Sequence, residues 1–129
     1  MQQIVTPGIV LSRTDFGEAD RIITVITPEG KLSLLAKGSR KIKSRLAGGI
    51  ELFTINDYVY IQGRGEIQTL RGASMRKSFS NIVKNLDRTQ AGYVMIRLVN
   101  KQTERQCESD YFKVLEIALD SLNDDSISL

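Results

Sequence analysis

The chain has 129 residues, of which 41% are hydrophobic and 26% charged, and its formal net charge is +3. This composition is typical of one folded domain and unlike that of disordered or membrane-spanning chains. The absence of His and the single Cys107 exclude Cys/His zinc sites, imidazole bases, Ser-His triads and an internal disulfide. We predict no metal and no cofactor. Without a long apolar run or a signal-peptide pattern, we expect a cytoplasmic protein that makes no membrane contact.

The first part of the chain is predicted to form short strands separated by turns. The triplets Pro28-Glu29-Gly30 and Gly63-Arg64-Gly65 are turn signals that join strands into hairpins. Five strands without helical spacing between them favour a small closed or partly closed β-barrel. The five share short length and β-branched or apolar content, and they are residues 9–13, 21–27, 31–36, 53–62 and 66–71.

A cation-rich segment, residues 37–45 (KGSRKIKSR), follows the third predicted strand. Its cations repel one another and add nothing to folding, but opposite a polyanion each can release a counterion from a phosphate. Gly38 lets the backbone turn, and the serines supply further donors for phosphate oxygens. The alternative is a solvated surface loop, as most short charge runs are. The segment holds no acid, and its cations are Lys37, Arg40, Lys41, Lys43 and Arg45.

The strand over residues 53–62 alternates between two kinds of side chain. One face carries apolar residues interrupted by Asp57, and the other carries Thr54, Asn56, Tyr58, Tyr60 and Gln62. We therefore expect Tyr58 and Tyr60 on the wetter face, where two tyrosines could stack nucleic-acid bases. The alternative, which the small number of aromatic residues favours, is that both are ordinary strand residues covered by the helices.

After residue 78 the apolar period changes to three and four, which predicts three amphipathic helices that pack on each other and on one side of the barrel. Ser109 or Asp110 is available to cap the last helix. The fold class is thus α+β, with a barrel domain over residues 1–77 and a partial helical domain over 78–129. The repeating apolar positions are Phe79, Ile82, Val83 and Leu86, then Ala91, Val94, Met95, Leu98 and Val99, then Tyr111, Phe112, Leu115, Leu119 and Leu122.

Charge is divided unevenly along the chain. Residues 1–80 hold 12 Lys and Arg against 7 Asp and Glu, whereas residues 81–129 hold 6 against 8. The basic character belongs to the part that contains the cation-rich segment. This division predicts one region that faces a polyanion and another that faces something else.

Residues 8–53 resemble the N-terminal region of the bacterial recombination mediator family RecO, and residues 81–100 resemble the first helices that follow its barrel. The resemblance rests on an apolar strand ending near an Arg, an aromatic-Gly pair, a Thr-x-x-Gly turn and an Ala-Lys-Gly strand end followed by basic residues. The matching positions are Arg13, Phe16, Gly17, Glu18, Asp20, Thr27, Gly30, Ala36, Lys37, Gly38, Arg40, Lys43, Ser44, Leu46 and Gly48.

The resemblance implies an OB-fold barrel followed by helices, which binds single- and double-stranded DNA, anneals strands and loads recombinase with RecR and single-strand binding protein. The implied DNA contacts fall on the five cations of residues 37–45, with Arg13 and Arg64 as further candidates. The chain lacks the family's zinc motif and is about half the family's usual length. We therefore expect either a fragment or a reduced relative.

The leading hypothesis is a DNA-binding recombination mediator that is not an enzyme. The alternative is a protein-interaction adaptor whose OB-fold retains little DNA binding. Glu18 and Asp20 resemble paired catalytic carboxylates, but the neighbouring Arg13 and Arg21 favour a local ion-pair network that fixes the first hairpin.

Overall fold

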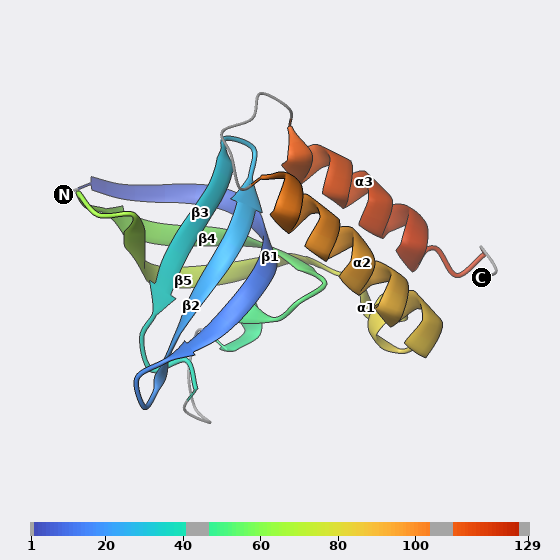
Figure 1. Cartoon of the computed structure of the whole chain (residues 1–129), viewed down its shortest axis with the longest axis horizontal. Helices are drawn as coiled ribbons and strands as arrows, with labels where there is room; N and C mark the ends of the chain where they lie inside the picture. Colours follow the sequence, from blue (N-terminus) through green and yellow to red (C-terminus); the bar gives the residue numbers. More distant parts are fainter. Residues whose placement is uncertain (1, 41–46, 104–109, 127–129) are drawn as a thin grey trace.

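The computed structural model describes residues 2–40, 47–103 and 110–126, and within them five strands form a closed barrel with α-helices packed on one side (Figure 1). The order around the barrel is β1-β2-β3-β5-β4, and β4 pairs back with β1. The prediction of an α+β fold with a small OB-type barrel followed by helices is confirmed. The strands are β1 (Gln2–Phe16), β2 (Asp20–Thr27), β3 (Gly30–Ala36), β4 (Thr54–Gln62) and β5 (Ile67–Ser78), and the 3-10 helix η1 (Ala47–Ile50) precedes β4.

The long strand β1 closes the barrel because it pairs with two neighbours in turn. Residues 2–9 pair with β4, residues 9–16 pair with β2, and the register shifts between Val10 and Ser12. The sequence predicted only residues 9–13 of this strand. Position 8 of this strand is a glycine, and a Cβ there would come 3.1 Å from the ring of Tyr58, so a larger residue would crowd that ring. The parallel ladder between β3 and β5 is short and joins residues 33–35 to 67–69.

Three α-helices follow the barrel in the part of the chain that the structure describes: α1 (Ser80–Val83), α2 (Leu86–Gln102) and α3 (Tyr111–Asn123). The side chain of Asn85 accepts a hydrogen bond from the backbone of Arg88 and caps α2. The side chain of Asp110 accepts one from the backbone of Lys113, so the predicted cap at Asp110 is confirmed. Among the described helices, none is long and apolar enough to cross a membrane.

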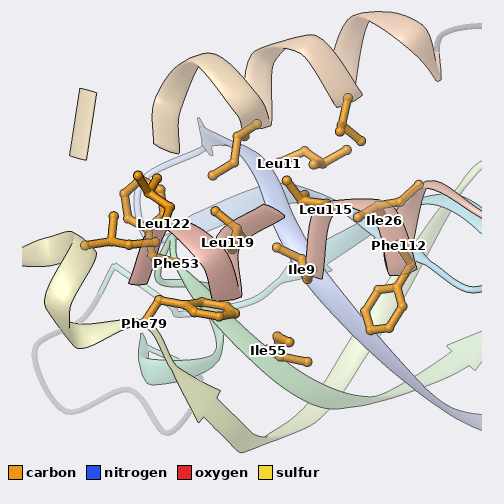
Figure 2. Packing of buried hydrophobic residues seen from close by; sticks show 13 residues of the cluster. Ile9, Leu11, Ile26, Phe53, Ile55, Phe79, Phe112, Leu115, Leu119 and Leu122 are labelled. Atoms are coloured by element: carbon orange, nitrogen blue, oxygen red, sulfur yellow. The ribbon is translucent and has the colours of Figure 1, made fainter. Parts of the chain in front are cut away.

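Two apolar clusters hold the molecule together. One fills the interior of the barrel and includes Ile23, Leu34 and Tyr58. The other lies between the outer face of the barrel and the helices, and we call it the helical side. In Figure 2, Leu115 and Leu119 of α3 lie beside Ile9 of β1. The predicted packing of helices on one another and on the barrel is thus confirmed. The buried members of the helical side are Ile9, Leu11, Ile26, Phe53, Ile55, Phe79, Ile82, Ile96, Val99, Phe112, Leu115, Leu119 and Leu122.

Helix α2 is rotated relative to the predicted stripe. Val94 and Leu98 were expected to be covered, but their side chains are 47% and 55% exposed. The buried face instead contains Arg88 and Gly92. A Cβ at Gly92 would come 2.5 Å from the ring of Phe53, so the helix approaches the barrel through this glycine.

Candidate nucleic-acid interface

The turn between β1 and β2 is bonded to the beginning of the cation-rich segment. The backbone N–H of Arg40 donates to the carbonyl of Ala19 at 3.0 Å, and its guanidinium donates to the carbonyl of Gly17 at 3.0 Å. The backbone N–H of Gly38 donates to a carboxylate oxygen of Asp20 at 2.7 Å. We call residues 13–21 and 37–40 the loop end of the barrel, because these bonds join them into one surface.

Positive backbone φ angles shape both parts of the loop end. Gly17 has φ = 65° and Gly38 has φ = 69°, which is the left-handed region that favours glycine. Each glycine turns the chain close to the end of a strand: Gly17 directly follows β1, and Gly38 is two residues after the end of β3. The sequence therefore folds this way locally because glycine stands where the chain reverses.

Asp15 is the centre of the ion pairs at the loop end. One of its carboxylate oxygens lies 3.1 Å from Nε of Arg21 and 3.6 Å from Nε of Arg40. The guanidinium of Arg13 lies 3.6 Å from the carboxylate of Glu51. The ion-pair network predicted around the first hairpin is present, but it is built on Asp15 rather than on the predicted Glu18 and Asp20.

Lys37 differs from these arginines. Its side chain is exposed, and no ion pair or hydrogen bond joins its ammonium group to residues 2–40, 47–103 or 110–126. It lies close to Arg40, as predicted for members of one segment. The predicted site residues Lys41, Lys43 and Arg45 lie outside the described residues. The loop end and the neighbouring Glu51 together carry equal numbers of cations and acids. The cations are Arg13, Arg21, Lys37 and Arg40, and the acids are Asp15, Glu18, Asp20 and Glu51.

The structure does not bring Arg64 to the loop end. Arg64 lies between β4 and β5. In Figure 1 the turn that joins these two strands is next to the N-terminus, whereas the β1–β2 turn is at the lower end of the barrel. Arg13 is at the loop end, but Glu51 already pairs with it. Of the two further candidates, Arg13 is therefore the one that belongs to the loop end.

The prediction that Tyr58 lies on the wetter face of its strand is wrong. Tyr58 is 0% exposed and projects into the barrel interior, where its hydroxyl donates to the carbonyl of Gly49 at 2.6 Å. Burial raises the pKa of the Tyr58 hydroxyl well above its ordinary value, so the group stays protonated and donating. Its ring is not accessible to a nucleotide base in this structure.

Tyr60 shares the interior face with Tyr58 but is half-buried. It lines a cavity of about 390 Å³ at one mouth of the barrel, together with Ile4, Thr6, Thr27 and Leu32. This mouth lies beside the β2–β3 turn, and the loop end is at the other ends of those strands. Tyr60 is thus separated from the cations with which it was grouped.

The opposite face of β4 is the outer face, and this explains the acid that interrupts its apolar pattern. Asp57 points outward and forms an ion pair with Arg76 of β5, with Oδ2 and Nε 3.3 Å apart. Ile55, on the same face, is buried because the helices cover it. The helices cover the first part of this face and leave the part around Asp57 to water.

Sequence reasoning missed Phe16 as a candidate contact residue at the loop end. Its side chain is 48% exposed, whereas Phe53, Phe79 and Phe112 are 3%, 0% and 7% exposed. The signal was an aromatic residue directly before the glycine of a turn. Among the described residues, no group of Cys, Asp and Glu side chains is arranged to hold a metal ion.

Comparison with known proteins gives a consistent set of matches. A family model described as "Recombination protein O N terminal" matches residues 1–79. A DNA repair protein RecO from Roseiflexus sp. is 37% identical over 119 residues, covering 92% of this chain and 42% of that protein. Its namesake in Acetivibrio thermocellus is 36% identical over 124 residues, covering 95% and 48%. Another from Bacillus cytotoxicus is 31% identical over 128 residues, covering 95% and 51%. The chain spans about half the length of these curated relatives.

Proposed function

Because this chain belongs to the RecO family of DNA repair and recombination proteins, we propose that its barrel binds single- and double-stranded DNA through the phosphate backbone. The contacts are made by Lys37, Arg40, Lys41, Lys43 and Arg45, with Arg13 beside them. Binding is electrostatic and involves no bond chemistry. It shows little base preference, because phosphates carry no sequence information.

The observation that supports this proposal most is that hydrogen bonds attach the start of an acid-free run of cations to the β1–β2 turn. Hydrogen bonds from Arg40 and Gly38 fix the start of the run to the β1–β2 turn, and the ammonium of Lys37 is exposed beside them. Preorganised cations lose little entropy when they meet a phosphate. Lys37 and Arg40 therefore contribute more to binding than the same two residues would in a free loop.

The ion pairs at the loop end are compatible with phosphate binding. The side chain of Asp15 is 59% exposed and those of Arg21 and Arg40 are 29% and 34% exposed. Exposed pairs of this kind contribute about 0–1 kcal/mol each. A phosphate can therefore replace Asp15 at the guanidinium of Arg40 at small cost.

We also propose the finer activities that the family resemblance implies. These are annealing of complementary strands and recombinase loading with RecR and single-strand binding protein, in the cytoplasm. In this division of labour, residues 1–77 bind DNA and residues 78–129 belong to the helical part. Since the chain spans about half of its relatives, these activities require tests on this chain itself.

The proposal is tested by fluorescence anisotropy with single-stranded and duplex DNA of one length, titrated at several salt concentrations. Changing Lys37, Arg40 and Lys43 together to Gln removes three phosphate contacts. Each contact contributes about 0.7 (single strand) to 0.9 (duplex) to the slope of log K against log salt, so the slope should flatten by about 2 to 3.

A matched control removes the same charge from the helical part of the chain, residues 78–129. Lys84, between α1 and α2, and Arg97 and Lys101, on α2, are exposed, and changing all three to Gln lowers the net charge equally. The control should keep the wild-type slope. Equal losses in the two triple variants, or an unchanged slope in the first, would contradict a localised interface.

A second candidate function is a protein-interaction adaptor with little DNA binding. It is favoured by the exposed apolar pairs Val94 and Leu98 on α2 and Val114 and Ile117 on α3, each 47–57% exposed. Under this alternative, the wild-type chain binds both forms of DNA weakly, and the Lys37/Arg40/Lys43 variant shows the same salt slope as the Lys84/Arg97/Lys101 variant. The same titration therefore separates the two candidates.

A further inference from the structure

Phe16 is an exposed aromatic residue at the last paired position of β1. Its side chain is 48% exposed, although each of the other phenylalanines in the chain is buried. It pairs with Asp20 of β2, and the chain then turns through Gly17. A single exposed apolar residue is ordinary on a protein surface, so its surroundings decide what it can do.

The first relevant feature is the row of residues across the strands at this point. Asp20 pairs with Phe16 on one side, and on the other the pairing of Arg21 with Ala36 brings Lys37 next to Asp20. Neighbouring strands are about 4.8 Å apart, so the backbones at Phe16 and Lys37 are separated by about 10 Å. A strand of nucleic acid whose phosphate meets Lys37 therefore passes within reach of the ring.

The second feature is the face on which the ring lies. Ile23 and Leu34 point into the barrel, so the alternate residues Ile22 and Leu35 point outward. Thr14 pairs with Ile22, and Phe16 follows Thr14 by two residues on the same outer face. The outer face of the second and third strands, flanked by the turn before them, is the surface on which OB-folds hold oligonucleotides.

The third feature is the fixed position of the turn that carries the ring. The guanidinium of Arg40 and its backbone N–H bond to the carbonyls of Gly17 and Ala19, both at 3.0 Å. The neighbouring Asp15 is held by Arg21 at 3.1 Å. An aromatic ring presented on a fixed backbone binds at a smaller entropic cost than one on a free loop.

We infer that Phe16 stacks on an unpaired base of single-stranded DNA while the neighbouring cations hold the phosphates. This inference rests on the proposed function and adds a preference to it. Phosphate contacts alone serve single strands and duplexes alike, but bases inside a duplex are already stacked on one another. The ring therefore strengthens binding of single strands and leaves duplex binding to the cations.

The test measures the affinity of a Phe16→Ala variant for single-stranded and duplex DNA of equal length. Loss of one stacked base should weaken single-strand binding about 5- to 150-fold, while duplex affinity stays within about twofold. The salt slope should be unchanged, because no charge is lost. Phe16→Leu should resemble Phe16→Ala, since it keeps apolar bulk but has no aromatic face.

A Phe16→Trp variant gives a direct readout, because the chain contains no other Trp. We expect it to bind single strands as well as the wild type does, with its emission quenched by single-stranded DNA and much less by duplex. Leu86→Ala, which trims a side chain that is 72% exposed on α2, serves as the control and should change neither affinity.

The outcomes separate this inference from the function on which it rests. Salt-dependent binding of wild type together with unchanged single-strand affinity in Phe16→Ala overturns the stacking and leaves the phosphate interface standing. Equal weakening of both DNA forms, or equal quenching of the Trp variant by both, overturns it as well and assigns Phe16 a structural or protein-contact role. Failure of the wild type to bind either form overturns both proposals.

Discussion

At the loop end of the barrel, polar side chains hold the chain through contacts that water still reaches, whereas on the helical side the contacts are apolar and dry. The carboxylate of Asp15 is 59% exposed while it pairs with two arginines. Phe79 and Leu119, on the helical side, are both 0% exposed. Exposed ion pairs can exchange partners at little cost, but a buried apolar contact cannot be exchanged without opening a cavity. The proposed binding surface thus lies apart from the contacts that stabilise the fold most.

The largest effect on stability should come from the helical side. Phe79→Ala removes a fully buried ring at the junction of β5 and α1, where its backbone N–H also bonds to Phe53. We expect the free energy of unfolding to fall by about 3–5 kcal/mol, measured by urea denaturation. Val83→Ala, at a side chain that is 61% exposed, should change it by less than about 0.5 kcal/mol. Similar losses in both variants would remove the contrast between the two regions.

An intermediate effect is expected in the barrel interior. Tyr58→Phe keeps the ring but takes away the hydroxyl that donates to Gly49. A buried carbonyl left without this donor should lower the free energy of unfolding by about 1–3 kcal/mol. Tyr60→Phe is the matched control, because the hydroxyl of Tyr60 has no hydrogen bond to the described residues. A control that loses as much stability would contradict a specific role for the bond.

The same tyrosine gives a pH dependence with a definite sign. Burial raises the pKa of Tyr58 in the folded protein above that in the unfolded chain, which is about 10. Above that pH the unfolded chain releases a proton that the folded protein retains, so stability should fall as pH rises. The difference in stability between wild type and Tyr58→Phe should therefore shrink at alkaline pH.

The smallest effect on stability should come from the loop end. Asp15→Asn removes the shared partner of Arg21 and Arg40, and we expect the free energy of unfolding to change by less than about 1 kcal/mol. DNA affinity should rise by about two- to fivefold, since the carboxylate of Asp15 no longer competes with a phosphate for the two guanidinium groups. Asp125→Asn, at an exposed residue near the C-terminus, should alter neither quantity. Weaker DNA binding in Asp15→Asn would show that Asp15 helps to position the interface.

The fold could be predicted from the sequence to the extent that local patterns determine it. Turn residues and the change of apolar period at residue 78 correctly indicated a barrel followed by helices. The face of β4 was assigned wrongly because the barrel interior contains polar side chains. Asn56 donates to the hydroxyl of Thr54, which in turn donates to the carbonyl of Glu51, each at 2.9 Å. Buried polar residues that hydrogen-bond to one another give the same sequence pattern as a solvent-exposed face of a strand.

The rotation of α2 could not be predicted for a related reason. Its buried face contains Gly92, which has no apolar side chain, and Arg88, whose guanidinium donates to the carbonyls of Leu122 and Asp124 at the end of α3. Neither residue contributes to an apolar stripe. The packing of α2 depends on the close approach of Gly92 to Phe53 and on carbonyls more than 30 positions from Arg88. A local pattern of apolar residues contains neither kind of information.

The candidate site was predictable where it is contiguous and unpredictable where it depends on pairing. Lys37 and Arg40 are neighbours because one short segment carries both. The contact between Arg40 and Asp15 spans 25 positions and exists because the β1–β2 hairpin turns back beside the end of β3. The same hairpin places Phe16 in one row with Asp20 and Lys37. The sequence could therefore supply the charges but not the partners that restrain them.

The short ladder between β3 and β5 gives the barrel an uneven wall. Along β3, residues 30–36 are all joined to β2, but β5 reaches only residues 33–35. The part of β3 that β5 leaves unpaired is mainly residues 30–32, which follow the β2–β3 turn and line the cavity beside Tyr60. The barrel wall is therefore single-sided at that mouth, whereas at the opposite mouth the β5 ladder reaches Leu35, one residue before the end of β3.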